Sequence, residues 1–327
     1  MNQDAIIETA RQRDSETARQ RDSETNSLYL NKLDTSHDNS QVNIPGLTRK
    51  MQLVELDIFK AFKSICEKHN LRYFAIGGTC IGAIRHKGFI PWDDDMDVAM
   101  PYEDYVKFFE VAGTELPENL KMWDLSSRKH FPLLFSKIYN INTTFIEADN
   151  LPYKENYAGV FIDIFPIYGM PSGKLRQKIF IFIVRMLRKC DLILRFKLHE
   201  TFKKKIFLFM LRNKPFYYFL ILTKKFLSKY KHFDSSDKII FPWRPLPGEP
   251  QGKYYKGVFY YEDFKNFPEV PFEDTTMRVP VGYDRYLTMD FCDYMQLPPE
   301  EERISSHSQG GIIDFERSYK YYQERLN

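Results

Sequence analysis

The sequence is poor in cysteine and has no long uninterrupted apolar run. Its four cysteines, Cys66, Cys80, Cys190 and Cys292, are scattered through 327 residues without a CxxC pair. This argues against a disulfide scaffold or a zinc site, and for reduced thiols in a cytoplasmic setting. Lys or Arg interrupts each apolar stretch before it reaches the roughly 20 residues that span a bilayer. The N-terminus, MNQDAIIETARQRD, also lacks the apolar core of a signal peptide. We therefore expect a cytosolic protein.

The net charge of +3 is the sum of two parts of opposite sign. Residues 172–232 hold 17 Lys or Arg and only two acids, so this segment carries +15 and the rest of the chain −12. Basic residues alternate there with large apolar and aromatic ones, which is typical of amphipathic basic helices. We favour peripheral contact with the anionic inner face of a membrane. A solvated basic face is the alternative, and nucleic-acid binding is disfavoured because no such motif accompanies the charge.

The chain divides into four parts by composition. Residues 1–44 contain TARQRDSE twice in tandem, at Thr9–Glu16 and Thr17–Glu24, and are too polar to bury a core. We interpret them as a disordered tail, with an interaction arm as the alternative. Residues 45–171 form the expected catalytic core, 172–235 the basic helical insertion, and 236–327 a C-terminal part that packs back on the core.

Hydrophobic periodicity in the core predicts an α+β fold. Apolar residues at three- and four-residue steps predict an amphipathic helix over 47–70, and a second helix is expected at 102–111. Short strands are expected at 72–76, 97–100, 121–125, 133–139 and 160–167. This order is not a regular βαβ alternation, so we expect a mixed sheet flanked by helices.

The stretch IPWDDDMDVAM places four acids at the start of an expected buried strand. Strand alternation predicts that Asp93, Asp95 and Asp97 share one face, while Asp94 lies on the other with Met96. Carboxylates two residues apart can hold a hard divalent cation such as Mg²⁺, with Mn²⁺ as the alternative ion. A solvated acidic turn is the other interpretation.

The residues before and after these acids point to phosphate chemistry. Gly77-Gly78-Thr79 follows a short strand, where paired glycines let the backbone approach a ligand. Arg85-His86-Lys87 could neutralise phosphate oxygens or form an ordinary basic loop. The order of these features resembles the nucleotidyltransferase-like fold: a strand, Gly-Gly-Thr, a helix, and then Asp-apolar-Asp-apolar.

Phosphoryl transfer also needs a third acid, either as a metal ligand or as a base. Asp163 lies in the apolar run GVFIDIFPI, where an unpartnered carboxylate would be costly to bury. Asp163 is therefore a functional candidate, with a core carboxylate satisfied by backbone N–H groups as the alternative.

Four stretches together resemble one known family. GGTCIGAIRHKGFIPWDDDMDVAM, GVFIDIFPIYGMP, VPFEDTTMRVPVGYDRYL and DYMQLPPEEERISSH are similar to the LicD family of choline-phosphate transferases, relatives of the fukutin-related proteins. The resemblance runs from about Leu47 to His307. Tyr139, at a position that is more often basic, and Cys292, in place of a glycine, depart from the family pattern.

The resemblance implies transfer of phosphocholine, or a related phospho-alcohol, from a CDP-linked donor such as CDP-choline. The acceptor would be a hydroxyl of a cell-surface glycan precursor (lipopolysaccharide, teichoic acid or capsule), and CMP would be released. Nucleotidyl transfer to a sugar phosphate and an inactive nucleotide-binding homologue are the alternatives.

The implied residue roles follow the matched motifs. The Mg²⁺ ligands would be Asp95 and Asp97, supported by Asp93. The phosphate-facing turn would be formed by Gly77, Gly78 and Thr79. The donor phosphates would be contacted by Arg85, His86 and Lys137. Asp163 would be the base, an inference from the wider fold. We also expect Asp94→Asn to be milder than Asp97→Asn.

Overall fold

A computed structural model describes residues 46–123, 135–151, 154–195, 214–244, 257–305 and 311–325. The tandem repeat and much of the centre of the basic segment lie outside these ranges. The helices are α2 (Leu47–Lys68), α3 (Gly77–Ile81), the π-helix η1 (Gly82–His86), α4 (Tyr102–Glu115), α5 (Lys174–Arg195), α7 (Lys214–Ser228), α8 (Tyr283–Phe291) and α9 (Tyr319–Arg325). Single 3₁₀ turns are η2 (Ala148–Asn150), η3 (Lys154–Asn156), η4 (Tyr261–Phe264) and η5 (Glu300–Glu302).

The strands form one large mixed sheet and two small two-stranded sheets. They are β1 (Phe74–Ala75), β2 (Asp97–Pro101), β3 (Leu120–Trp123), β4 (Ser136–Asn140), β5 (Thr144–Ile146), β6 (Phe161–Gly169), β7 (Lys238–Ile240), β8 (Val258–Tyr260), β9 (Glu269–Phe272), β10 (Thr275–Arg278) and β11 (Ile312–Asp314). The large sheet has the order β1-β2-β6-β4-β3, and β7 extends it from β6 to β8. Among the strands of the described ranges only β2 and β6 run parallel, so the expectation of a mixed sheet flanked by helices is confirmed.

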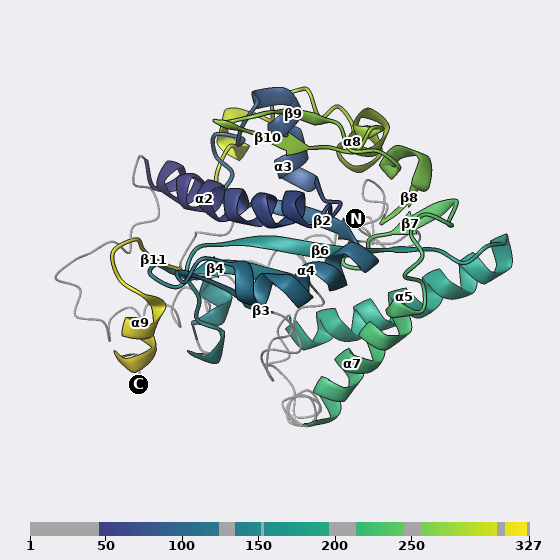
Figure 1. The fold of residues 1–327 in the computed structure, drawn as a ribbon, viewed down its shortest axis with the longest axis horizontal. Coiled ribbons are helices and arrows are strands. Elements are labelled where there is room, and N and C mark those ends of the chain that lie inside the picture. Colours follow the sequence, from purple (N-terminus) through teal and green to yellow (C-terminus); the bar gives the residue numbers. More distant parts are fainter. Residues whose placement is uncertain are drawn as a thin grey trace, which may run out of the picture.

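Aromatic residues of α2 pack against α4 and against the residue that precedes β1. Phe62 contacts Tyr73 and Phe108, with ring centroids 5.2 and 4.9 Å apart. The face of α2 that was expected from its periodicity is buried, and the helix ends where Asn70 takes a positive φ of 51°. In Figure 1 α2 lies along one side of the sheet, next to α3 and the β9–β10 hairpin, whereas α5 and α7 extend from the opposite side.

Residues after 236 complete the molecule around this sheet. Strand β7 pairs with the end of β6, β11 pairs with β5, and the hairpin of β9 and β10 lies near η1. At the hairpin turn Glu273 has a positive φ of 52°, and its N–H donates to the carbonyl of Lys87 at 2.8 Å. The C-terminal residues therefore support the loop that leads into the acidic stretch.

Candidate active site

The parallel pair β2 and β6 brings two predicted acids side by side. Asp97 is the register partner of Asp163, and the Asp163 N–H donates to the carbonyl of Met96 at 2.9 Å. Register partners on neighbouring strands have their side chains on the same face of the sheet. The two carboxylates therefore lie next to each other, although 66 positions separate them in the sequence.

The acidic stretch alternates between partly exposed and buried side chains. Asp93, Asp95 and Asp97 are partly exposed, whereas Asp94 and Met96 are almost fully buried. Regular strand structure begins at Asp97, which confirms the strand expected at 97–100 and places Asp93 and Asp95 just before it. The alternation nevertheless extends back through them and separates the side chains as predicted.

Asp94 is held by the C-terminal part of the chain. Its carboxylate accepts a hydrogen bond from the hydroxyl of Ser305. This contact fixes Asp94 on the buried side of the stretch, away from the face shared by the other three acids. Its position indicates a structural role.

The glycine turn lies directly against two of the partly exposed acids. Gly77 has a positive φ of 55°, and a Cβ at this position would lie 3.5 Å from Asp97 Oδ2. A Cβ at Gly78 would overlap Asp93 Oδ2. Glycine at Gly78 is therefore needed to make room for the Asp93 carboxylate, and glycine at Gly77 suits the positive φ and leaves the space in front of Asp97 open. Thr79 Oγ1 accepts a hydrogen bond from the Asp97 N–H at 2.8 Å, so the threonine ties the turn to the start of β2.

The acids repel one another in the absence of a cation. Burial raises the pKa of Asp93 well above its usual range, and the charges of Asp95, Asp97 and Asp94 raise it further. A proton or a cation relieves such repulsion. The donor set consists of carboxylate oxygens, which are the ligands that Mg²⁺ prefers.

The residues present fit a cation that is shared with a substrate. In the part of the chain that the structure describes, no three His, Cys, Asp or Glu side chains are arranged to hold a metal ion together. Mg²⁺ usually takes only one or two carboxylates and completes its shell with waters and substrate phosphates. A pair such as Asp95 and Asp97 suits that mode of binding.

Lys137 is directed at Asp163. The two are register partners on β4 and β6, and the Lys137 Nζ lies 2.9 Å from Asp163 Oδ1 and 3.2 Å from the centroid of the Phe161 ring. Burial raises the pKa of Asp163 to about 6, and the Lys137 charge opposes this rise. A carboxyl with this pKa can accept a proton at neutral pH. The structure thus gives Lys137 a partner within the protein, and a contact with donor phosphate stays a prediction.

Arg85, near the end of η1, contacts the C-terminal part, whereas the ring of its neighbour His86 lies against Trp92. The Arg85 guanidinium donates to the carbonyls of Tyr294 at 2.6 Å and Gln296 at 3.2 Å. Burial lowers the pKa of His86, and the nearby charge of Arg85 lowers it further. Both effects favour the neutral imidazole, and the contact of His86 with donor phosphate stays a prediction. Arg85 stays a candidate, in a position set by the 294–296 segment.

Glu55 is an acid of this region that the sequence reasoning missed. It is 1% exposed on α2, and among the described residues neither of its carboxylate oxygens has a hydrogen-bond partner. Burial raises the pKa of Glu55 well above its usual range, and so do the charges of Asp95, Asp94, Asp93 and Asp97. The available signal was an acid at a core position of an amphipathic helix, four residues after Met51.

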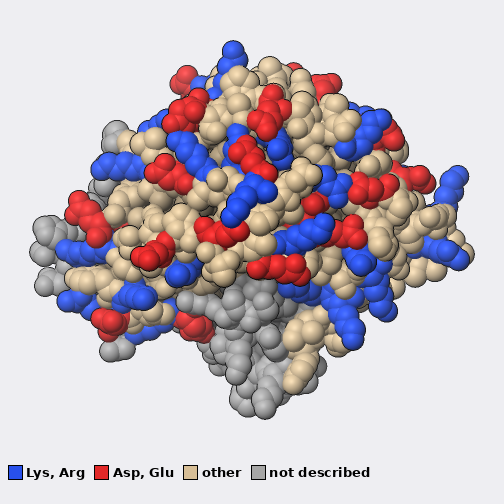
Figure 2. Space-filling view, in the orientation of Figure 1, with Lys and Arg blue, Asp and Glu red and all other residues tan. Residues whose placement is uncertain are grey.

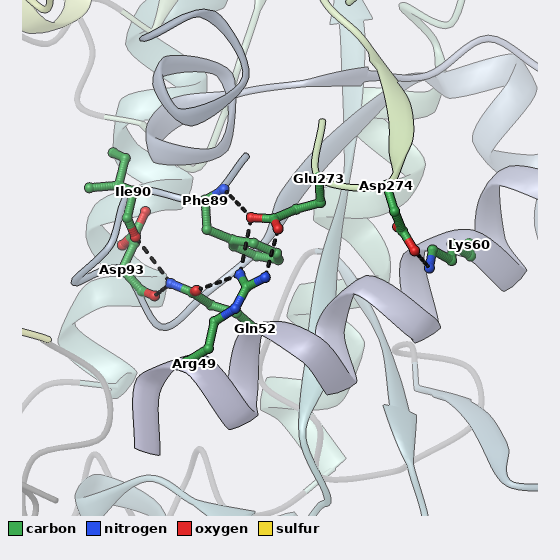
Figure 3. A network of polar contacts seen from close by, with 8 residues as sticks. All are labelled: Arg49, Gln52, Lys60, Phe89, Ile90, Asp93, Glu273 and Asp274. Atoms are coloured by element: carbon green, nitrogen blue, oxygen red, sulfur yellow. Dashed lines mark hydrogen bonds and ion pairs between the residues drawn. The ribbon is translucent and has the colours of Figure 1, made fainter. Parts of the chain in front are cut away.

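Polar side chains of α2, linked by hydrogen bonds, hold the backbone of the loop that leads into the acidic stretch. The Gln52 amide donates to the carbonyls of Ile90 at 3.1 Å and Asp93 at 2.9 Å (Figure 3). Arg49 donates to Gln52 Oε1 and to both carboxylate oxygens of Glu273, which in turn accepts the Phe89 N–H. The loop before Asp93 is therefore held by α2 and by the β9–β10 hairpin together.

Comparison with known proteins identifies the family. Residues 70–183 match the family model described as LicD/FKTN/FKRP, nucleotidyltransferase domain. The lipopolysaccharide cholinephosphotransferase LicD of Haemophilus influenzae is 32% identical over 279 residues, which cover 81% of this chain and 97% of the relative. An uncharacterized protein of Rickettsia typhi is 33% identical over 73 residues, or 22% of this chain and 24% of that protein. The expected resemblance is confirmed, and the chain belongs to the LicD family.

Proposed function

We propose that the protein transfers phosphocholine, or a related phospho-alcohol, from a CDP-linked donor to a hydroxyl of a cell-surface glycan precursor. The observation that carries this proposal is the similarity to the Haemophilus influenzae cholinephosphotransferase over nearly the whole of that relative. The group of acids around Asp97 and the glycine turn supplies a site whose chemistry fits a diphosphate donor. A lipopolysaccharide precursor is the acceptor that the name of this relative favours over teichoic acid or capsule.

The transfer replaces one phosphorus–oxygen bond with another. The acceptor hydroxyl oxygen attacks the phosphorus that carries choline, the bond to CMP breaks, and CMP leaves with that electron pair. Asp163, whose carboxylate lies beside Asp97, takes the hydroxyl proton. Such displacements depend mainly on positioning and on neutralising charge.

Asp95 and Asp97, supported by Asp93, would hold Mg²⁺ or Mn²⁺, which would neutralise charge on the diphosphate oxygens. Gly77 leaves room for phosphate in front of Asp97, and Gly78 leaves room for the Asp93 carboxylate itself. Thr79 fixes the turn through the Asp97 N–H, and Arg85 is a candidate for balancing phosphate charge. Each of these roles is part of the proposal.

The products distinguish this activity from the two alternatives. Incubation with Mg²⁺ and CDP-choline, in the presence of a glycan acceptor, should release CMP. Nucleotidyl transfer would instead consume CTP and a sugar phosphate and release pyrophosphate, while an inactive homologue would do neither. If CTP is consumed and CDP-choline is not, the proposed reaction is wrong. A panel of CDP-linked donors then identifies the transferred alcohol.

We also propose that the α5 and α7 pair contacts an anionic membrane surface, where a lipid-linked acceptor would lie. Leu175, Ile179, Phe182 and Met186 follow one another at four- and three-residue steps on α5 and are 47–72% exposed. On α7, Tyr218 and Leu222 are 58% and 63% exposed. In Figure 2 blue Lys and Arg side chains gather at the end of the molecule that α5 forms in Figure 1. An exposed apolar stripe with basic flanks is the pattern of a helix that lies in a membrane interface.

This contact would be peripheral. Among the described residues no helix is long and apolar enough to cross a bilayer. Each Lys or Arg near an anionic surface contributes about 1 kcal/mol of attraction. The full chain should therefore sediment with vesicles that contain anionic lipid and much less with neutral ones, and salt should release it. Equal sedimentation with both kinds of vesicle, or with neither, would contradict the proposal.

A further inference from the structure

Arg244 reaches the glycine turn from a distant part of the chain. It follows β7, where its N–H donates to the carbonyl of Phe241 at 3.1 Å. A Cβ at Gly77 would lie 4.0 Å from Arg244 Nη2 and 3.5 Å from Asp97 Oδ2. The guanidinium and the carboxylate therefore border the same small space in front of the turn.

Two buried groups of α8 hold the guanidinium in this position. Asp290 is fully buried and forms an ion pair with Arg244 Nη2, and the hydroxyl of the buried Tyr286 is hydrogen-bonded to Arg244. The same hydroxyl accepts the Gly77 N–H at 2.9 Å. The plane of the guanidinium is thereby fixed relative to the turn, and the Phe291 ring lies 5.3 Å from its central carbon.

The charges in this network persist at neutral pH. Burial raises the pKa of Asp290 to about 6, and Arg244 opposes the rise, so the carboxylate is ionised at pH 7. Burial lowers the pKa of Arg244, but Tyr286, Asp290 and Asp97 outweigh it, and the guanidinium stays charged. Its side chain is 20% exposed, so a ligand at the turn can still reach it.

We infer that Arg244 binds an oxygen of the donor's diphosphate at the Gly77 turn, and that Asp290 and Tyr286 orient it for this contact. The identification of the diphosphate as part of a CDP-linked donor rests on the proposed function. A guanidinium matches phosphate oxygens with two parallel N–H donors, which an ammonium group cannot do. A purely structural bond between α8 and the turn is the competing explanation.

Donor affinity separates the two explanations. We expect Arg244→Gln to weaken binding of CDP-choline by about 10- to 100-fold in titration calorimetry, because a hydrogen bond to a charged group is lost. Binding of CDP should weaken in parallel, whereas cytidine, which has no phosphate, should bind as it does to the wild type. Arg244→Lys should recover only part of the affinity. Arg278→Gln is the matched control. Arg278, on β10, is also partly buried and forms an ion pair with Glu269.

A second variant guards against simple misfolding. Removing Arg244 alone leaves Asp290 as an unpaired buried carboxylate, whereas Arg244→Gln combined with Asp290→Asn removes both charges. If the double variant melts like the wild type but still binds CDP-choline weakly, the contact with phosphate is supported. Wild-type affinity in any folded variant that lacks the guanidinium would overturn the inference.

Pyrophosphate makes the test independent of the donor. If the wild type neither binds nor converts any CDP-linked compound, the proposed function fails, yet Arg244→Gln should still weaken binding of pyrophosphate relative to Arg278→Gln. If the wild type releases CMP and Arg244→Gln binds both CDP-choline and pyrophosphate as tightly, only the inference on Arg244 fails.

Discussion

Two regions depart in opposite ways from the usual arrangement of apolar residues inside and charged residues outside. Charged side chains are buried around Asp97, and apolar side chains are exposed on the α5–α7 pair. In the first region Glu55 and Asp94 are buried, and Asp93 and Asp163 have raised pKa values. In the second, Phe182 and its neighbours on the stripe are exposed. Each arrangement costs free energy in isolation, which is typical of surfaces that meet a ligand or a partner. A cation would relieve the first, and a membrane the second.

The two faces of α5 offer the largest effect on stability. Phe180 is 2% exposed and its ring contacts those of Phe226 and Tyr230, at 5.7 and 4.2 Å between centroids. Phe180→Ala should lower the free energy of unfolding by about 3–5 kcal/mol, measured by denaturant unfolding. Phe182→Ala, two residues along the same helix, should leave stability nearly unchanged and reduce vesicle binding. A reversal of these two results would show that the stripe belongs to the core.

The two faces of the acidic stretch should differ in activity. Asp97→Asn should reduce CMP release by about 100-fold or more, the usual loss when a group that stabilises developing charge is removed. Asp94→Asn should be milder, because Asp94 contacts Ser305 on the buried side and an amide oxygen can still accept that hydrogen bond. Circular dichroism establishes that both variants are folded. Equal losses in the two variants would remove the distinction between the faces.

The pH dependence of the rate tests the pairing of Lys137 with Asp163. With Asp163 as base, CMP release should rise with pH through about 6, as this carboxyl loses its proton. Lys137→Met removes the charge that opposes the rise in the Asp163 pKa. The rising limb of the pH–rate profile should therefore shift to higher pH by about one to three units. Lys121→Met, on the exposed side of β3, is the control and should leave the limb in place. An unmoved limb in Lys137→Met would contradict the assignment of Asp163 as base.

The smallest effects concern α2, where Gln52 and Lys60 make contacts of different kinds (Figure 3). Gln52→Leu removes the Gln52 donor from the Asp93 carbonyl and leaves the Ile90 carbonyl with only the Asp93 N–H, and it should lower the free energy of unfolding by about 1–3 kcal/mol. Lys60→Ala removes an ion pair with Asp274 whose side chains are 38% and 66% exposed, and should cost about 0–1 kcal/mol. Thermal unfolding of the two variants measures the difference. Equal costs would mean that the acidic stretch does not depend on Gln52.

Sequence periodicity was sufficient for the main elements of the core, but several boundaries moved. The expected strand at 72–76 shortens to β1, and the one at 133–139, of which 133 and 134 lie outside the described residues, corresponds to β4 and continues to Asn140. The expected helix at 102–111 continues to Glu115. Tertiary hydrogen bonds decide such ends, because a strand extends only as far as its partner does.

The sequence named the acids and the glycine turn as candidate site residues, but it did not reveal which residues surround them. The acid in GVFIDIFPI stood out because a carboxylate in an apolar strand needs a reason. Its position opposite Asp97 follows from the pairing of β2 with β6, which no local pattern specifies. Arg244 and Asp290 were missed because their ion pair joins segments 46 residues apart, and neither segment carries a recognisable phosphate motif.

The sequence by itself determined the family, the α+β pattern, the acidic stretch and the basic segment, because these depend on local order and composition. Only the tertiary structure decided which charged groups meet: Asp97 with Asp163, Lys137 with Asp163, and Arg244 with the glycine turn. The physical reason is that strand register and helix packing are set by burial of the whole core. The partners of a charged side chain at this site are therefore set by how the core packs, more than by the residues next to it in the sequence.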